Sequence, residues 1–169
     1  MTKLNQLANL GQAVWLDNIS RKLITSGELG NLVGQGVRGV TSNPSIFENA
    51  IVGSADYDEN LSALVLSGKS VVDIYEALVL EDIGRAADVL RKVYDQTSGA
   101  DGYVSLEVSP TLAHNTAGTI AEASRLFSTL NRPNIMIKIP ATPAGIPAIQ
   151  TAISKGINVI KLNSIRLLF

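Results

Sequence analysis

The sequence predicts an α/β protein of the (β/α)8 barrel type, in which only about the first five strands are present. Short apolar runs alternate with longer amphipathic segments, and this alternation is typical of strands that pair in parallel through helical connections. Four of these runs also end in polar residues, as expected where a barrel carries its active site. An open parallel sheet, the alternative, would not need polar residues at the ends of four successive strands.

The composition favours one globular domain over residues 1–169. Hydrophobic residues make up 46% of the chain and charged residues 17%, which is enough for a sizeable core. The net charge is −1 and basic residues form no run, so neither nucleic acid nor a membrane surface is indicated as a partner. Cysteine is absent, which excludes disulfides and cysteine-based metal sites. We expect a cytoplasmic protein, since no signal peptide or membrane-spanning run is recognisable. We expect neither a metal nor a cofactor.

The first half of the chain contains two predicted strands among several predicted helices. Ser20 can cap a helix, and the Ser98-Gly99 and Asp101-Gly102 pairs can end one. The expected elements in order are a short helix over 4–10, a strand over 13–17, a helix of sequence RKLITSGEL after Ser20, a strand over 37–43, a helix near DYDENLSALVLSG and a long helix from Val71 to about Gln96.

The second half repeats the strand-helix alternation more regularly. Asn131 and Pro133 can end one helix, and Gly156 can end another. The expected elements are a strand over 103–108, a helix from Thr116 to Leu130, a strand over 135–139, a helix from about Ala144 to Lys155 and a fifth strand that begins at residue 157.

The polar residues of the first four strands share one face. Side chains alternate between the two faces of a strand, so residues two apart point the same way. The opposite face is mostly apolar and suits packing under helices. We therefore expect convergence on one cavity at the carboxyl ends of the strands, formed by Asp17, Thr41, Asn43, Glu107 and Lys138.

Lys138 is the most informative of these residues because it lies between Ile137 and Ile139 in a strand that is predicted to be buried. Removal of a lysine from water disfavours its ammonium form, and the neutral amine can attack a ketone to form a Schiff base. The iminium accepts the electron pair when a neighbouring C–C bond breaks, without a metal. Asp17 and Glu107 are available as proton carriers. The pattern favours a Schiff-base aldolase or transferase.

Structural roles are the alternative for each of these residues. Asp17 can cap a helix, Glu107 can accept hydrogen bonds from backbone amides, and Lys138 can serve a purely structural purpose. His114 is the only histidine and has no partner at metal-ligand spacing, so no role is assigned to it. Trp15 is assigned to packing.

Four runs of the sequence resemble transaldolases of the longer bacterial type, along residues 1 to about 159: VWLDNISR, GVTSNPSIF, DGYVSLEVSP and MIKIPATPAGIPAI. The resemblance implies a (β/α)8 barrel and transfer of a dihydroxyacetone unit between sugar phosphates. The donor would be sedoheptulose 7-phosphate or fructose 6-phosphate, and the acceptor an aldose phosphate of the pentose phosphate pathway.

The matching motifs also imply a role for each site residue. Lys138 corresponds to the Schiff-base lysine of the family. Asp17 corresponds to the acid/base of C–C cleavage, and Glu107 to the carboxylate that assists imine formation through water. Asn43 corresponds to the side chain that hydrogen-bonds the dihydroxyacetone moiety, and Thr41 lines the same wall.

The resemblance ends near residue 159, after which the chain continues as IKLNSIRLLF. We expect residues 160–169 to be a divergent tail, and we assign no role to Lys161 or Arg166. The family would continue with a water-holding threonine and with serine and arginine groups that bind phosphate. Two alternatives therefore stay open: an aldolase that releases free dihydroxyacetone, and a catalytically inactive truncated product. The sequence indicates no oligomeric state.

Overall fold

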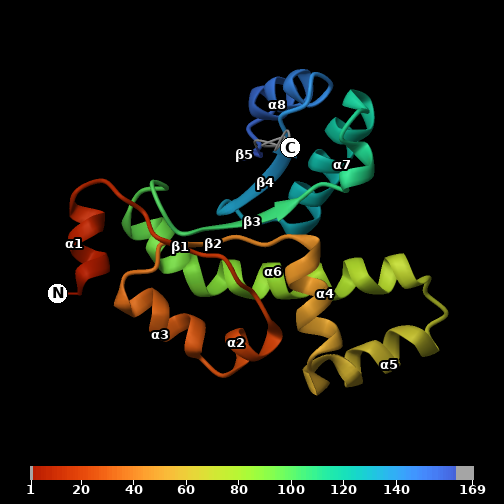
Figure 1. Ribbon diagram of the computed structural model, residues 1–169, viewed down its shortest axis with the longest axis horizontal. Coiled ribbons are helices and arrows are strands. Elements are labelled where there is room, and N and C mark those ends of the chain that lie inside the picture. The colour runs from red at the N-terminus through yellow and green to blue at the C-terminus, as the bar shows by residue number, and fades with distance from the viewer. Residues whose placement is uncertain (1, 163–169) are drawn as a thin grey trace, which may run out of the picture. The chain divides into compact units, whose positions relative to one another are not determined.

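A computed structural model describes residues 2–162 and contains five strands (Figure 1). The strands form one sheet in the order β1-β2-β3-β4-β5, and the pairings of β1 with β2, β2 with β3 and β4 with β5 are parallel. This sequential parallel order is that of the first five strands of a (β/α)8 barrel and confirms the predicted fold class. The strands are β1 (Trp15–Leu16), β2 (Gly39–Val40), β3 (Tyr103–Glu107), β4 (Ile135–Pro140) and β5 (Val159–Leu162).

The chain divides into two compact units, Met1–Val104 and the residues from Ser105 onward. The single domain expected over residues 1–169 stays a prediction. The first unit contains α1 (Lys3–Asn9), α2 (Arg21–Thr25), α3 (Glu28–Gln35), α4 (Pro44–Val52), the short 3-10 helix η1 (Ala55–Tyr57), α5 (Asp58–Leu66) and α6 (Val71–Gln96). The second contains η2 (Pro110–Leu112), α7 (Thr116–Leu130) and α8 (Gly145–Ser154).

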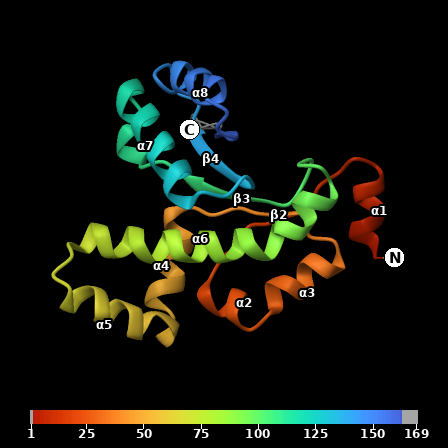
Figure 2. The same cartoon turned by 180° about the vertical axis from the view of Figure 1, so that it is seen from behind.

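The long helix α6 organises the first unit. It begins at Ser70, whose hydroxyl accepts a hydrogen bond from the Asp73 N–H (3.2 Å), and it ends where Ser98 and Gly99 adopt positive φ angles of 52° and 81°. Its buried face contacts α2, α3 and α5, which lie beside it in Figures 1 and 2. The predicted bounds of this helix are confirmed. They could be predicted because capping and stop residues are local features of the sequence.

The pairing of β1 with β2 depends on a close approach at Gly39. A Cβ atom at this position would lie 2.3 Å from the Trp15 ring, so only glycine leaves room for the indole over the strand. Trp15 is half-buried, and its packing against Gly39 confirms the role expected for it. The Trp15 ring thus covers β2 at Gly39, one residue before the carboxyl end of that strand.

Two expectations for the first unit need correction. The segment RKLITSGEL forms two helices rather than one, because Gly27 adopts a left-handed φ of 80° between α2 and α3. The cap expected from Ser20 is present, since its Oγ accepts a hydrogen bond from the Leu23 N–H (3.2 Å). The strands predicted over 13–17 and 37–43 are each only two residues long.

The second unit contains the end of β3 together with β4 and β5, and two helices cover β4. Ile135, Ile137 and Ile139 of β4 are fully buried, and α7 and α8 both contact β4 (Figure 2). The predicted bounds of α7 are confirmed, with Asn131 in the left-handed region (φ 46°) at its end. Residues 160–162 of the expected tail continue β5, whereas 163–169, with Arg166, lie outside the described residues.

Candidate active site

Glu107 and Lys138 form an ion pair in the second unit. Glu107 is the last residue of β3 and Lys138 lies in the carboxyl-terminal half of β4. The Val108 N–H donates to the Lys138 carbonyl oxygen (3.1 Å), which sets the two strands in register. The Lys138 Nζ lies 3.3 Å from the Glu107 Oε2, and the two side chains are 10% and 12% exposed. The pair is nearly buried.

The surroundings of Lys138 are apolar along its own strand. Its two neighbours, Ile137 and Ile139, are fully buried and point to the other face of the sheet. In β5, Ile160 pairs with Lys138 in the parallel register. This confirms the predicted alternation, in which a single cation interrupts a strand of buried isoleucines.

The loops that follow Glu107 and Lys138 are tied to one another. The Thr116 hydroxyl donates to the Ala144 carbonyl oxygen (2.7 Å), and the Thr142 hydroxyl donates to the Ala113 carbonyl oxygen. A Cβ at Gly145 would lie 1.9 Å from the Pro140 carbonyl oxygen, so the turn after β4 requires glycine. These ties fix the two loops that border the ion pair.

Glu122 holds the backbone that follows Glu107. Its Oε1 accepts a hydrogen bond from the Ser109 N–H (3.1 Å), two residues beyond Glu107. Neither Glu122 nor Thr142 was identified from the sequence. The Gly145 in the run PATPAG was the available signal for a tight turn after the lysine strand.

In the first unit, Asp17 and Thr41 lie next to each other. Each directly follows its strand, and the Thr41 N–H donates to the Leu16 carbonyl oxygen (2.9 Å), which extends the parallel pairing to this point. The Asp17 side chain is exposed and the Thr41 side chain is half-buried. A carboxylate and a hydroxyl are thus placed side by side at the carboxyl ends of β1 and β2.

Asn43 begins helix α4. Its Oδ1 accepts a hydrogen bond from the Ile46 N–H (2.9 Å), and Pro44 occupies the first turn, where a missing N–H costs nothing. This helix was not predicted from NPSIFENAIV, although an asparagine cap followed by proline is a recognised start signal. The cap uses the carbonyl oxygen, so the amide NH2 group is the part of Asn43 that can donate to a ligand.

All five predicted site residues lie at or just beyond the carboxyl-terminal part of a strand. The structure brings Glu107 together with Lys138, and Asp17 together with Thr41. The first pair belongs to the second unit and the other residues to the first unit. Their convergence on one cavity stays a prediction.

A second charged cluster, which the sequence reasoning missed, is buried inside the first unit. The Arg21 Nε donates to the Asp82 Oδ1 (3.0 Å) and the Arg21 Nη2 to the Glu81 Oε2 (2.7 Å). The Tyr57 hydroxyl donates to the Asp82 Oδ2 (2.7 Å), and the guanidinium lies 4.7 Å from the centre of the Tyr57 ring. We call these four residues the Arg21 cluster.

Burial controls the ionisation of the Arg21 cluster. It raises the pKa of the Asp82 carboxyl, which the Tyr57 hydroxyl and the Arg21 guanidinium oppose. Burial also raises the pKa of the Tyr57 hydroxyl, and its bond to Asp82 adds to this effect. For Arg21, burial lowers the pKa, but the nearby Asp82 and Glu81 carboxylates more than offset it and the net direction is upward.

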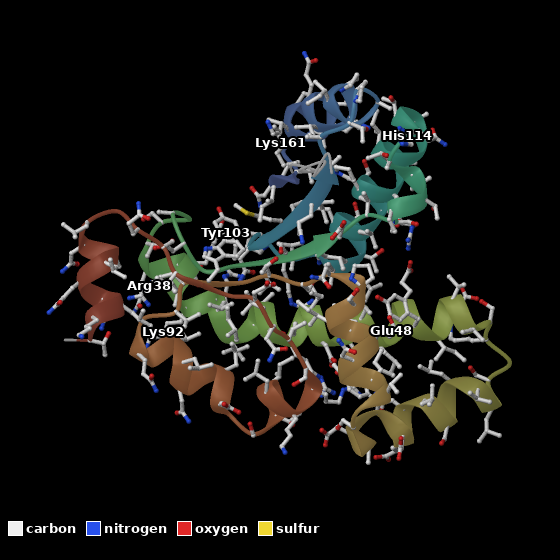
Figure 3. The ribbon with its side chains drawn as sticks, viewed as in Figure 1. Arg38, Glu48, Lys92, Tyr103, His114 and Lys161 are labelled. Carbon is white, nitrogen blue, oxygen red and sulfur yellow. The ribbon has the colours of Figure 1, made fainter. Side chains whose placement is uncertain are left out.

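Two of the residues to which no role was assigned from the sequence lie at the surface. His114 lies exposed in the turn before α7, and Lys161 lies exposed on β5 (Figure 3). Within residues 2–162, no three histidine, aspartate or glutamate side chains are arranged to hold a metal ion. No helix over the same residues has the length and apolar character required to cross a membrane.

Comparison with known proteins gives a consistent result. The family model described as Transaldolase/Fructose-6-phosphate aldolase matches residues 14–160. The chain is 52% identical over 157 residues to a transaldolase of Trichodesmium erythraeum, which covers 92% of this chain and 41% of that protein. It is 47% identical over 160 residues to a transaldolase of Thiobacillus denitrificans, with 94% and 45% covered. The chain thus spans about two fifths of the length of these curated relatives.

Proposed function

Because the chain belongs to the transaldolase/fructose-6-phosphate aldolase family, we propose that it carries the Schiff-base lysine and the proton carriers of a transaldolase-type transfer. The proposed donor is a ketose phosphate, fructose 6-phosphate or sedoheptulose 7-phosphate, and the acceptor is an aldose phosphate. The reaction would belong to the pentose phosphate pathway in the cytoplasm. The observation that supports this most directly is the ion pair of Lys138 and Glu107 in a nearly buried, apolar strand setting.

The first step is formation of the Schiff base. The Glu107 carboxylate, 3.3 Å from the Lys138 Nζ, is close enough to take a proton from the ammonium group. The neutral amine then attacks the ketone carbon of the substrate, and the carbinolamine hydroxyl leaves as water after it accepts a proton. Glu107 supplies that proton through a water molecule, so no net proton is gained or lost at this stage.

The second step is cleavage of the C–C bond. Asp17 takes the proton from the hydroxyl on the carbon that departs, and the aldose phosphate leaves as an aldehyde. The electron pair of the broken bond enters the iminium and gives an enamine on Lys138. This enamine attacks the aldehyde carbon of the acceptor, Asp17 returns the proton, and hydrolysis frees Lys138. The Asn43 amide and the Thr41 hydroxyl bind the hydroxyl groups of the dihydroxyacetone unit.

Borohydride trapping tests the role of Lys138. Dihydroxyacetone is the suitable ligand, because it forms the imine without a phosphate group and without C–C cleavage. We expect reduction to fix a three-carbon adduct on Lys138, and Lys138→Ala and Lys138→Arg to abolish it, since a guanidinium stays protonated. Lys155→Arg and Lys161→Arg, at exposed positions, are the matched controls and should keep the adduct. An adduct on Lys155 or Lys161 would overturn the assignment.

The alternative is an aldolase that releases free dihydroxyacetone, and the description of the matching family includes such an enzyme. The two functions differ in what happens to the enamine on Lys138. Fructose 6-phosphate without an acceptor would yield free dihydroxyacetone in an aldolase. A transaldolase would instead hold the three-carbon unit until an aldose phosphate is added. The names of the relatives favour transfer.

A further inference from the structure

The loop that carries Asp17 is short, and both of its ends are fixed. It consists of residues 17–20, between β1 and α2. At its start the Leu16 carbonyl oxygen accepts a hydrogen bond from the Thr41 N–H (2.9 Å). At its end the Arg21 N–H donates to the Tyr57 hydroxyl (2.9 Å). Ile19, in the middle of the loop, is fully buried, so only a small part of the loop is free to adjust.

The Arg21 cluster fixes the end of the loop in addition to the apolar packing of Ile19. The first N–H of a helix has no partner within the helix, and here Tyr57 supplies that partner. The same Tyr57 hydroxyl donates to Asp82, while the Arg21 guanidinium binds Asp82 and Glu81. Asp82 and Glu81 belong to α6, so the loop is connected to the long core helix of the unit.

Directional bonds to a planar guanidinium fix position more closely than apolar contacts do. A buried ion pair is weak evidence for stability, but it can define one arrangement of the elements that it joins. We propose that Arg21, Tyr57 and Asp82 are positioning residues for Asp17, which hold the loop so that the carboxylate meets the hydroxyl proton during C–C cleavage. This inference rests on the proposed function of Asp17.

The test separates imine formation from bond cleavage. Tyr57→Phe keeps the ring and removes only the hydroxyl that joins the Arg21 N–H to Asp82. In the whole chain we expect trapping of dihydroxyacetone on Lys138 to stay within about twofold of the wild type. Release of the aldose phosphate from fructose 6-phosphate should fall about 10- to 100-fold, as expected when a reacting group moves by about an ångström. Asp17→Asn gives the reference for full loss of cleavage.

Two further variants control for a loss of stability. Ile74 lies in the same apolar cluster as Tyr57 and makes no bond to Arg21. Ile74→Val should therefore leave both imine formation and C–C cleavage unchanged. Arg21→Lys keeps the charge and should cleave faster than Arg21→Met. Hydrogen exchange adds a readout that does not depend on activity: the amides of Asn18 and Ile19 should exchange faster in Tyr57→Phe but not in Ile74→Val.

Each outcome has a defined meaning. Wild-type cleavage and unchanged loop exchange in Tyr57→Phe would overturn the positioning role, even if trapping on Lys138 occurs as expected. Equal loss of trapping and of cleavage would also overturn it, because the cluster would then act on the whole protein. Failure of the wild-type chain to trap dihydroxyacetone would instead refute the proposed function, while faster loop exchange in Tyr57→Phe would still support the structural part of the inference.

Discussion

The two compact units each place a cation beside a carboxylate, and the two arrangements differ in the type of cation and in the number of carboxylates that bind it. In the first unit, the Arg21 guanidinium binds Asp82 at 3.0 Å and Glu81 at 2.7 Å, and Asp82 is fully buried. In the second unit, the Lys138 ammonium lies 3.3 Å from Glu107, and both side chains keep about a tenth of their surface exposed. A guanidinium stays protonated under all ordinary conditions, whereas a lysine can lose its proton.

The difference teaches which kind of buried charge suits the chemistry proposed for Lys138. The charge of Arg21 is permanent, and its directional bonds define the position of α2. The charge of Lys138 belongs to an ammonium group, which can lose its proton. Burial alone would not have distinguished them, since both residues are buried. The type of charge makes the distinction, because a guanidinium cannot lose its proton under ordinary conditions and an ammonium group can.

The largest expected effect is on the stability that the Arg21 cluster gives to the first unit. Asp82→Asn should lower the free energy of unfolding by about 3–5 kcal/mol, because it leaves the buried guanidinium with Glu81, which is partly exposed, as its one remaining charged partner in the Arg21 cluster. Asp95→Asn removes one partner of the exposed pair of Arg91 and Asp95 and should change it by less than about 1 kcal/mol. Urea unfolding of both variants measures the difference. Similar losses of stability in the two variants would mean that the Arg21 cluster contributes no more to stability than an exposed ion pair does.

For the ion pair of Lys138 and Glu107 we expect the opposite, a loss of chemistry with little loss of stability. Lys138→Met should abolish trapping of dihydroxyacetone, yet it should change the free energy of unfolding by less than about 1.5 kcal/mol, since Glu107 retains access to water and methionine fits an apolar strand. Circular dichroism during urea unfolding gives the stability, and mass spectrometry gives the adduct. A loss as large as that of Asp82→Asn would erase the contrast between the two pairs.

The smallest expected effect appears at alkaline pH and in one unit only. Burial raises the pKa of Tyr57 and of Tyr103, so the folded chain keeps protons that the unfolded chain loses above pH of about 10. Stability that is present below that pH should therefore fall as the pH rises, by at most about 1.4 kcal/mol per pH unit for each tyrosine. Tyr57→Phe should reduce this slope, and Ile74→Val should not.

Tyrosine content makes this pH dependence a test of the two units. All four tyrosines lie in residues 1–104. Hydrogen exchange between pH 9 and 11 should therefore show, after correction for the intrinsic rate, a greater loss of protection in the first unit. An equal loss in both would indicate that the units unfold together.

The sequence was most informative where local features define an element. The bounds of α6 and α7 follow from Ser70 and Asn115 as caps and from left-handed residues at their ends. The break at Gly27 was missed because the apolar pattern continues on both sides of it, and only the backbone conformation shows the interruption. The strands β1 and β2 are shorter than predicted, since a propensity for strand does not specify how many residues find a partner.

The candidate site shows the same division between local and distant information. Strand alternation and the isoleucines beside Lys138 were sufficient to predict that Lys138 and Glu107 share a face. The Arg21 cluster joins residues up to 61 positions apart, which no local pattern contains. One signal was present: Asp82 lies four residues after Leu78 and four before Ala86, within the apolar stripe of α6. A carboxylate there requires a buried partner.

The close packing of Trp15 on Gly39 gives the protein an optical probe of its own. Trp15 is the only tryptophan, so the whole indole emission of the chain originates two residues from Asp17. Separation of β1 from β2 would expose the ring to water and shift this emission to longer wavelength. Fluorescence therefore reports the integrity of the strand ends that carry Asp17 and Thr41, while circular dichroism reports the helices. Comparison of the two signals during unfolding would reveal whether this edge of the first unit opens before its helices melt.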